Sequence, residues 1–299
     1  MKQSDGRISM SGSTVKLIAL AAMFTDHFAA VFVSRLINSG AAEAVNPLLT
    51  RIYIYMRAIG RIAFPLFVFL LIEGVIHTRS KWKYLGRMAL FAVISEIPFD
   101  LAFNVNRYNV RRGRILEFSY QNVFFTLAIG LLVVIIIEYL WKSISFSPKA
   151  VENLGEPAHK AVKNLGEPAP GAAQNLRGAV SEGKLVRAAQ NAVKFCLSAV
   201  VSAAGIALSI FLKTDYSGIG VLAVVIMYAF RKKRCFGAAA VSLVLSVYSL
   251  IELPAFLSVI PVYFYNGSRG RNVKWLFYIF YPAHLLVLWC VCMLLGIVS

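Results

Sequence analysis

Long apolar stretches recur along most of this 299-residue chain, and they constrain its fold more than any other feature. A helix needs about 20 apolar residues to cross the hydrocarbon core of a bilayer. Apolar residues make up 59% of the chain and charged residues only 15%, whereas a soluble domain carries roughly 25% charged residues. The chain therefore has too little charge to cover a water-facing surface. The sequence predicts an all-α, polytopic bundle of transmembrane helices.

Six stretches are long enough to cross a membrane once, and the segment 217–265 is predicted to form shorter, broken helices. Together they give about nine spans, with a range of eight to ten. The predicted spans are 15–36, 52–76, 84–104, 121–141, 192–212, 217–230, 236–252, 254–265 and 274–298. Short or broken helices at membrane depth are tolerated only inside protein or along a water-filled cavity. We therefore expect 217–265 to pack inside the protein or along a water-filled cavity.

The distribution of basic residues orients the predicted bundle. The net charge is +17, and the basic residues lie in short runs between apolar stretches, which is typical of membrane topology rather than of nucleic-acid binding. With the N-terminus in the cytoplasm, 22 Lys and Arg residues lie inside and seven outside. Four arginines in the outer loop at 105–120 fit this pattern poorly. We expect a multi-pass protein of a cell membrane, the bacterial inner or cytoplasmic membrane, with lipid and not nucleic acid as a partner.

A single domain is predicted over 1–299, with one large cytoplasmic insertion at 142–191. The insertion contains the sequence Asn-Leu-Gly-Glu-Pro-Ala at 153–158 and again at 164–169. Proline and the residue before it disfavour a continuous helix. The sequence therefore predicts a flexible, partly amphipathic linker on the basic side of the membrane.

Ionisable side chains inside the spans are costly, so each indicates an internal polar site. Arg57 and Arg61 are four residues apart and share a helix face, and so do Glu96 and Asp100. Their helices run in opposite directions, which matches Arg57 in depth with Asp100 and Arg61 with Glu96. We expect two structural ion pairs, and part of this network is expected to line a cavity. Lys16, Glu73 and Glu138 lie near span ends, where they can extend to the interface.

Two histidines are predicted to share a depth near the middle of the membrane. His27 lies roughly 16 Å beyond Lys16 along the first span, at 1.5 Å per residue, and His284 lies at a similar depth in the last span. Asp26 precedes His27, and neighbours on a helix point about 100° apart, so Asp26 is expected to contact another helix. Two histidines at one depth beside a carboxylate favour proton chemistry over a packing role.

Seven segments match a known family pattern in order, over most of 15–130 and 213–290. The segments are Lys16-Leu-Ile-Ala-Leu with Asp26-His27, Arg57-Ala-Ile-Gly-Arg61, Ile94-Ser-Glu-Ile-Pro-Phe-Asp100, Gln121-Asn-Val-Phe-Phe-Thr126, Asp215-Tyr-Ser-Gly-Ile-Gly220, Tyr265-Asn-Gly-Ser-Arg-Gly270 and Tyr278-Ile-Phe-Tyr-Pro-Ala-His284. In these segments the chain resembles the TraX family of membrane acetyltransferases, and the 142–191 insertion lies outside the resemblance.

The ten residues between Lys16 and His27 also resemble a broader superfamily of membrane acyltransferases. Members of that superfamily have a basic residue and a His at this spacing in an early span. The basic residue there is usually Arg, and the Lys of this chain lacks the planar fork that binds a phosphate through two hydrogen bonds.

These resemblances imply transfer of an acetyl group from cytoplasmic acetyl-CoA to an amine or hydroxyl of a peptide, small protein or envelope glycan. His27 is implied as the general base, with Asp26 and His284 as further catalytic residues. Acetyl-CoA is implied as the co-substrate, and no metal is expected. The residues expected to contact the co-substrate, or the oxyanion that develops on its carbonyl, are Lys16, Arg57, Arg61, Asn122 and Tyr281.

Two other classes of function stay open at this point. A proton-coupled transporter would also contain broken spans and intramembrane carboxylates. A non-catalytic membrane assembly subunit would keep its activity after loss of His27. An internal inverted repeat would favour the transporter, and we find none in the sequence.

Overall fold

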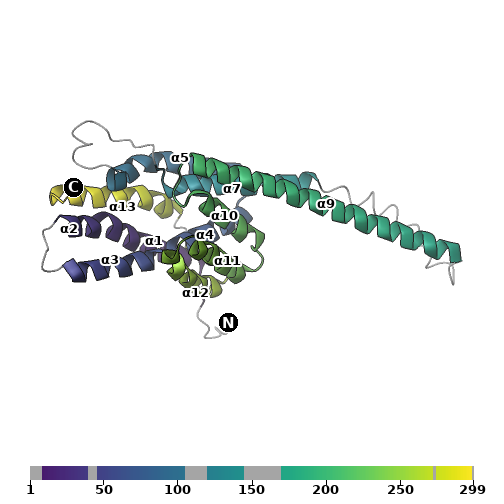
Figure 1. Ribbon diagram of the computed structural model, residues 1–299, viewed down its shortest axis with the longest axis horizontal. Helices are drawn as coiled ribbons and strands as arrows, with labels where there is room; N and C mark the ends of the chain where they lie inside the picture. Colours follow the sequence, from purple (N-terminus) through teal and green to yellow (C-terminus); the bar gives the residue numbers. More distant parts are fainter. Residues whose placement is uncertain (1–8, 40–45, 105–119, 145–169, 272–273, 298–299) are drawn as a thin grey trace. The chain divides into compact units, whose positions relative to one another are not determined.

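The computed structural model describes residues 9–39, 46–104, 120–144, 170–271 and 274–297 (Figure 1). Every regular element in these ranges is helical, which confirms the predicted all-α class for this part of the chain. The elements in order are α1 Gly12–His27, η1 Phe28–Val33, α2 Ser34–Asn38, α3 Asn46–Gly60, α4 Ala63–His77, α5 Lys81–Phe99, η2 Asp100–Asn104, α7 Val123–Ser143, α9 Pro170–Phe211, α10 Ser217–Ala229, α11 Arg234–Tyr248, η3 Leu250–Ser258, α12 Val259–Tyr263 and α13 Lys274–Leu294.

Five helical segments in the described ranges are long and apolar enough to cross a membrane. They are Gly12–Asn38, Pro47–His77, Val123–Ser143, Arg187–Phe211 and Trp275–Leu294. The short, broken helices predicted in 217–265 are present as Ser217–Ala229, Arg234–Tyr248 and Leu250–Tyr263. The total of nine spans stays a prediction, and the predicted outer loop at 105–120 lies outside the described residues except for Tyr120.

The segment from α11 to α12 is a helical hairpin that returns to its starting end. Arg234 begins α11 and donates to Glu73 Oε1 at 3.0 Å, and the hydroxyl of Tyr265, just after α12, donates to Glu73 Oε2 at 3.1 Å. Between them, the 3₁₀ helix η3 contains Pro254, which has no N–H to continue an α-helix. This geometry agrees with the two short segments predicted at 236–252 and 254–265.

Several helix ends gather at this end of the bundle. Met10, just before α1, forms a backbone bridge with Tyr265. Ser11 caps α1 by accepting from the N–H of Thr14 at 3.3 Å, and such caps satisfy one of the free donors at a helix start. The start of α1, the end of α4 and the start of α11 therefore meet, which is the end that the charge pattern assigns to the cytoplasm.

The chain divides into two compact units, and the candidate site lies wholly in the first. That unit comprises Met1–Val134 with Gly205–Ser299, and the second comprises Ile135–Ala204. Within the second unit, the indole N–H of Trp141 donates to Ser198 Oγ at 2.9 Å and joins α7 to α9.

The predicted linker at 142–191 is wrong in its second part, because α9 begins at Pro170. Proline suits the first position of a helix, where no N–H partner is needed. Both copies of the repeated sequence lie in 145–169, outside the described residues.

Candidate functional site

His27 and His284 contact each other across the interface of α1 and α13. His27 Nδ1 lies 2.7 Å from His284 Nε2, and the two rings are parallel with centroids 5.0 Å apart. The common depth predicted for the two side chains is therefore confirmed. His27 is the last residue of α1, where the helix continues into the π-helical turn η1. π-Helical turns are rare, and many of those that do occur lie at functional sites.

The hydrogen bonds of the pair assign the protons on both rings. His284 Nδ1 lies 2.6 Å from the carbonyl oxygen of Phe280, which can only accept. In a neutral imidazole one nitrogen donates and the other accepts. His284 Nδ1 therefore carries the proton and its Nε2 accepts, so His27 Nδ1 must donate to it. This assignment, made from the network, leaves His27 Nε2 unprotonated.

His27 forms part of the wall of a pocket of about 680 Å³, which we call the histidine pocket. Its wall comes mainly from α1, α3, α4, α11, η3 and the residues before α10, and α5, α7, α13 and the π-helical turns η1 and η2 add single side chains. Tyr281 belongs to this wall, and its ring centroid lies 5.8 Å from those of both histidines. The charged residues Asp26, Arg57, Arg61, Asp215 and Glu252 also line the pocket.

Four charged side chains form a network beside His27. Asp26 accepts from Arg57 through Oδ2 and from Arg61 through Oδ1, both at 2.6 Å. Arg61 also donates to Glu252 Oε1 at 2.7 Å. The two cations and two carboxylates neutralise one another, which lowers the cost of removing them from water. Asp26 thus contacts another helix, as expected.

The predicted pairing of these arginines with Glu96 and Asp100 is wrong. Matching by depth gives the height of a residue along the membrane but not the direction in which it points. Helix α3 packs on α1, so Arg57 in its last turn and Arg61 just after it meet Asp26. Glu96 instead accepts from the side-chain amide of Asn122, and Asp100 is fully buried where α5 continues into η2.

The close contact of α1 and α3 depends on Gly60. A Cβ atom at this position would overlap the side chain of Asp26. Only glycine lets the two backbones approach so that the carboxylate of Asp26 reaches Arg57 and Arg61.

The expected co-substrate residues separate into three groups. Arg57, Arg61 and Tyr281 line the histidine pocket, whereas Lys16 lines a second pocket. Asn122 lines neither of these two pockets. Its amide donates to the carbonyl of Ala92 at 2.8 Å and to Glu96, so both of its N–H groups are engaged.

The turn leading into α10, formed by residues 214–217, lines the histidine pocket. No role was predicted for it from the sequence. Asp215 accepts from the hydroxyl of Tyr120 at 2.6 Å. Tyr216 and Ser217 have φ angles of 58° and 44°, which are strained for residues other than glycine. The ring of Tyr216 stacks on Phe64 at 3.8 Å between centroids. The signal in the sequence was the Asp-Tyr-Ser-Gly motif between two apolar stretches.

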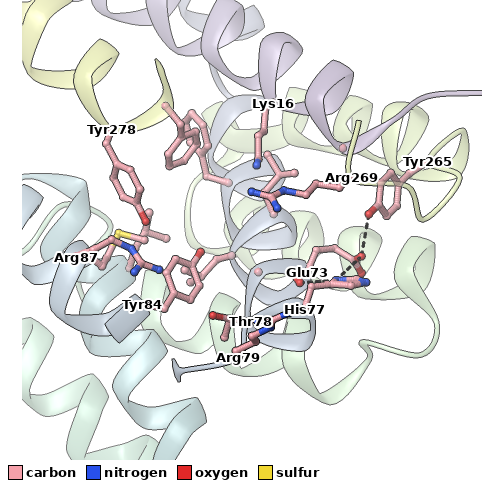
Figure 2. Close-up of a pocket in the computed structure, with 18 of the residues that line it drawn as sticks. Lys16, Glu73, His77, Thr78, Arg79, Tyr84, Arg87, Tyr265, Arg269 and Tyr278 are labelled. Atoms are coloured by element: carbon pink, nitrogen blue, oxygen red, sulfur yellow. Dashed lines mark hydrogen bonds and ion pairs between the residues drawn. The ribbon is translucent and has the colours of Figure 1, made fainter. Parts of the chain in front are cut away.

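A second pocket of about 510 Å³ lies at the end of the bundle where α1 begins, and we call it the basic pocket. Figure 2 shows Lys16, Arg79, Arg87 and Arg269 around it. Within the described residues, the Nε–H of Arg87 is buried without a hydrogen-bond partner. From the sequence, Arg79 and Arg87 count only among the 22 basic residues assigned to the inner side. Arg79 lies between the predicted spans 52–76 and 84–104, and Arg87 lies near the start of the second, so their closeness in sequence could have indicated a shared site.

Glu73 is the carboxylate of the basic pocket, and it is already paired. It is buried, with 6% of its surface exposed, and it binds Arg234 and the Tyr265 hydroxyl. The Tyr265 hydroxyl donates to Glu73 Oε2 at 3.1 Å. The expectation that Glu73 extends to the interface is therefore wrong. Because its charge is compensated by Arg234, the pocket keeps an excess of positive charge.

No group of three or more His, Cys, Asp or Glu side chains in the described ranges is arranged to hold a metal ion.

Comparison with known proteins gives one family and one curated relative. The TraX protein family model matches residues 11–151 and 182–292. A protein of Dichelobacter nodosus, described as probable fimbrial assembly protein FimC, serogroup H1, is 35% identical over 136 residues. The match covers 43% of this chain and 47% of that relative, so the chain spans about half of the relative's length. No solved structure matches. The apolar helices of this chain mark it as a membrane protein, and the match to the family model shows that the chain belongs to the TraX family.

Proposed function

We propose that this protein is an integral membrane acetyltransferase. It moves an acetyl group from acetyl-CoA to an amine or hydroxyl of a peptide, small protein or envelope glycan. The observation that supports this most strongly is the His27–His284 pair, because its hydrogen bonds leave His27 Nε2 unprotonated at the edge of a 680 Å³ pocket. An imidazole nitrogen in this state is a general base near neutral pH.

His27 Nε2 takes the proton that the acceptor amine or hydroxyl loses as it bonds to the acetyl carbon and the carbon–sulfur bond breaks. The same proton then passes to the leaving thiolate. His284 holds the ring of His27 in the reactive tautomer by accepting from Nδ1 at 2.7 Å. A positioned acid–base group of this kind contributes roughly 10²–10⁴-fold to the rate.

The basic pocket suits the phosphate groups of acetyl-CoA. Lys16, Arg79, Arg87 and Arg269 line it, and Glu73 is neutralised by Arg234. The Nε–H of Arg87, buried without a partner in the described residues, is a donor that an anion would satisfy. Bound there, acetyl-CoA supplies an acetyl group activated as a thioester. Arg57 and Arg61 line the histidine pocket and not the basic pocket, so the proposal does not place them at the phosphates.

The proposed topology has nine spans and a cytoplasmic N-terminus in the bacterial inner or cytoplasmic membrane. It places the basic pocket on the side where acetyl-CoA is found. The return of α12 to the end where α11 begins supports this count, because it keeps Arg231 and Arg269 on one side.

A second candidate is a non-catalytic subunit for membrane assembly. It is favoured by the relative described as a probable fimbrial assembly protein. The two candidates differ in whether any envelope component gains an acetyl group. An acetyltransferase whose acceptor is an assembly component would agree with both observations.

Mass spectrometry of envelope peptides and glycans separates the two candidates. Cells that contain the protein and cells that lack it are compared for peptides and glycans that have gained the mass of an acetyl group. The proposal predicts at least one acetylated component that depends on the protein. Identical acetylation in both cultures, together with an assembly defect, would support the assembly subunit instead.

A further inference from the structure

The histidine pocket and the basic pocket are neighbours along the bundle, and one aromatic side chain belongs to both. On α4, Ala63 lines the histidine pocket and Leu70 lines the basic pocket, with Phe67 lining both. These three residues follow one another along the helix at spacings of four and three, so they share one face. The ring of Phe67 therefore lies between the two spaces.

Other helices also line both pockets, and they pass from one pocket to the next near the level of Phe67. On α13, Tyr278 lines the basic pocket and Tyr281, about one turn further, lines the histidine pocket. On α7, Phe124 packs against both tyrosines, with ring centroids 6.5 Å and 4.9 Å away. A layer of buried aromatic rings thus separates the pockets.

Within this layer Phe67 is tightly held. Its exposed fraction is 6%, and its ring meets the edge of Phe277 at 5.3 Å between centroids. Phe277 lines the basic pocket only. A ring packed in this way moves aside by small amounts, and a larger displacement would require its neighbours to repack.

We propose that Phe67 is the partition between a donor chamber and an acceptor chamber, and that it limits the size of the acyl group transferred. The partition rests on the two pockets alone, whereas the acyl limit rests on the proposed function. In that function the phosphates lie in the basic pocket and the base lies in the histidine pocket. The acyl group must therefore pass Phe67 in each cycle, and a two-carbon group passes with the least displacement of the ring.

A labelling experiment tests the partition without any measurement of activity. The full chain is prepared in membrane vesicles with its four native cysteines replaced and with Ala63→Cys in the histidine pocket. A membrane-impermeant thiol reagent is then added from one side or from the other. With Phe67 intact, we expect modification from one side only. With Phe67→Ala, we expect modification from both sides.

Phe67→Leu is the milder variant if Phe67→Ala is poorly inserted, and Phe69→Leu is the matched control. Phe69 is on the same helix and equally buried, at 1% exposure, but it lines neither pocket. Modification from both sides with Phe67 intact would overturn the partition. So would labelling that stays one-sided in both Phe67 variants, or that becomes two-sided in Phe69→Leu.

Competition between acyl donors tests the size limit. Acetyl-, propionyl-, butyryl- and hexanoyl-CoA are compared in the wild type, Phe67→Ala and Phe69→Leu. One methylene is commonly worth 10–200-fold in discrimination, so Phe67→Ala should raise the ratio of butyryl to acetyl transfer by about tenfold or more. An unchanged ratio in Phe67→Ala would overturn the size limit. Absence of transfer by the wild type from every donor would instead overturn the proposed function, and the labelling result would still decide the partition.

Discussion

At the residue scale, the site consists of a hydrogen-bonded histidine pair beside a neutral cluster of four charges. The hydrogen bond between the two histidines runs from His27 to His284, because the Phe280 carbonyl can only accept from His284. In the proposed reaction, that direction leaves the proton-accepting nitrogen on His27 and makes His284 a positioning residue. Asp26 contacts the two arginines rather than an imidazole, so it supports the site by holding α3 against α1.

Substitution of His284 tests the direction of the pair. A Gln at this position keeps an oxygen that can accept from His27 Nδ1, whereas a Leu of comparable size removes the acceptor. We expect His284→Gln to retain a larger share of acetyl transfer than His284→Leu, with equal amounts of protein in the membrane. Equal losses in the two variants would show that His284 acts only through packing.

The charge network predicts an order of stabilities. Arg61 is buried between two carboxylates, while the side chain of Arg57 is 29% exposed and contacts one. Removal of one partner from a buried ion pair costs about 3–5 kcal/mol, because the remaining charge is left in a low dielectric. Arg61→Ala should therefore lower the unfolding temperature in detergent, the yield and the activity more than Arg57→Ala does. The reverse order would contradict the network.

At the element scale, the sequence predicted most of the helical segments, with the first part of α9 as an exception. It also predicted the common depth of the two histidines, because depth follows from the rise of 1.5 Å per residue. The direction of each side chain around its helix depends on which helices pack together, and no single-helix pattern contains that information. For this reason the partners of Arg57 and Arg61 were predicted wrongly, and the turn at Asp215 was given no role.

Gly60 gives the sharpest test of the contact between α1 and α3. A methyl group at position 60 would overlap Asp26, and overpacking of this kind typically costs 1–3 kcal/mol. Gly60→Ala should lower the unfolding temperature. Gly86→Ala is the matched control, because no atom lies within 4 Å of its added Cβ and alanine favours the helix. A stable Gly60→Ala variant would mean that the two helices are further apart.

At the scale of the whole molecule, the two pockets lie at successive levels of one helical bundle. Helices α1, α4 and α13 each contribute to both. The basic pocket lies where the helix ends rich in Lys and Arg gather, and the histidine pocket lies further along the bundle. This arrangement would let a donor and an acceptor arrive from opposite ends.

The topology prediction belongs to this scale. With nine spans and a cytoplasmic N-terminus, a single cysteine placed within 145–169 should react only with reagents that reach the cytoplasm. The charge asymmetry of 22 inner against seven outer basic residues is the reason. Reaction from the external side would overturn the span count and the side from which the donor enters.

The central claim is that His27 is the base for acetyl transfer, and purified His27→Ala tests it most directly. His159→Ala is the matched control, because His159 lies outside both segments that match the TraX family. We expect His27→Ala to insert and to bind acetyl-CoA like the wild type, since the basic pocket does not include this residue. Its rate of acetyl transfer should fall by roughly 10²–10⁴-fold, with no such loss in His159→Ala. Transfer by His27→Ala within a few-fold of the wild type would contradict the account.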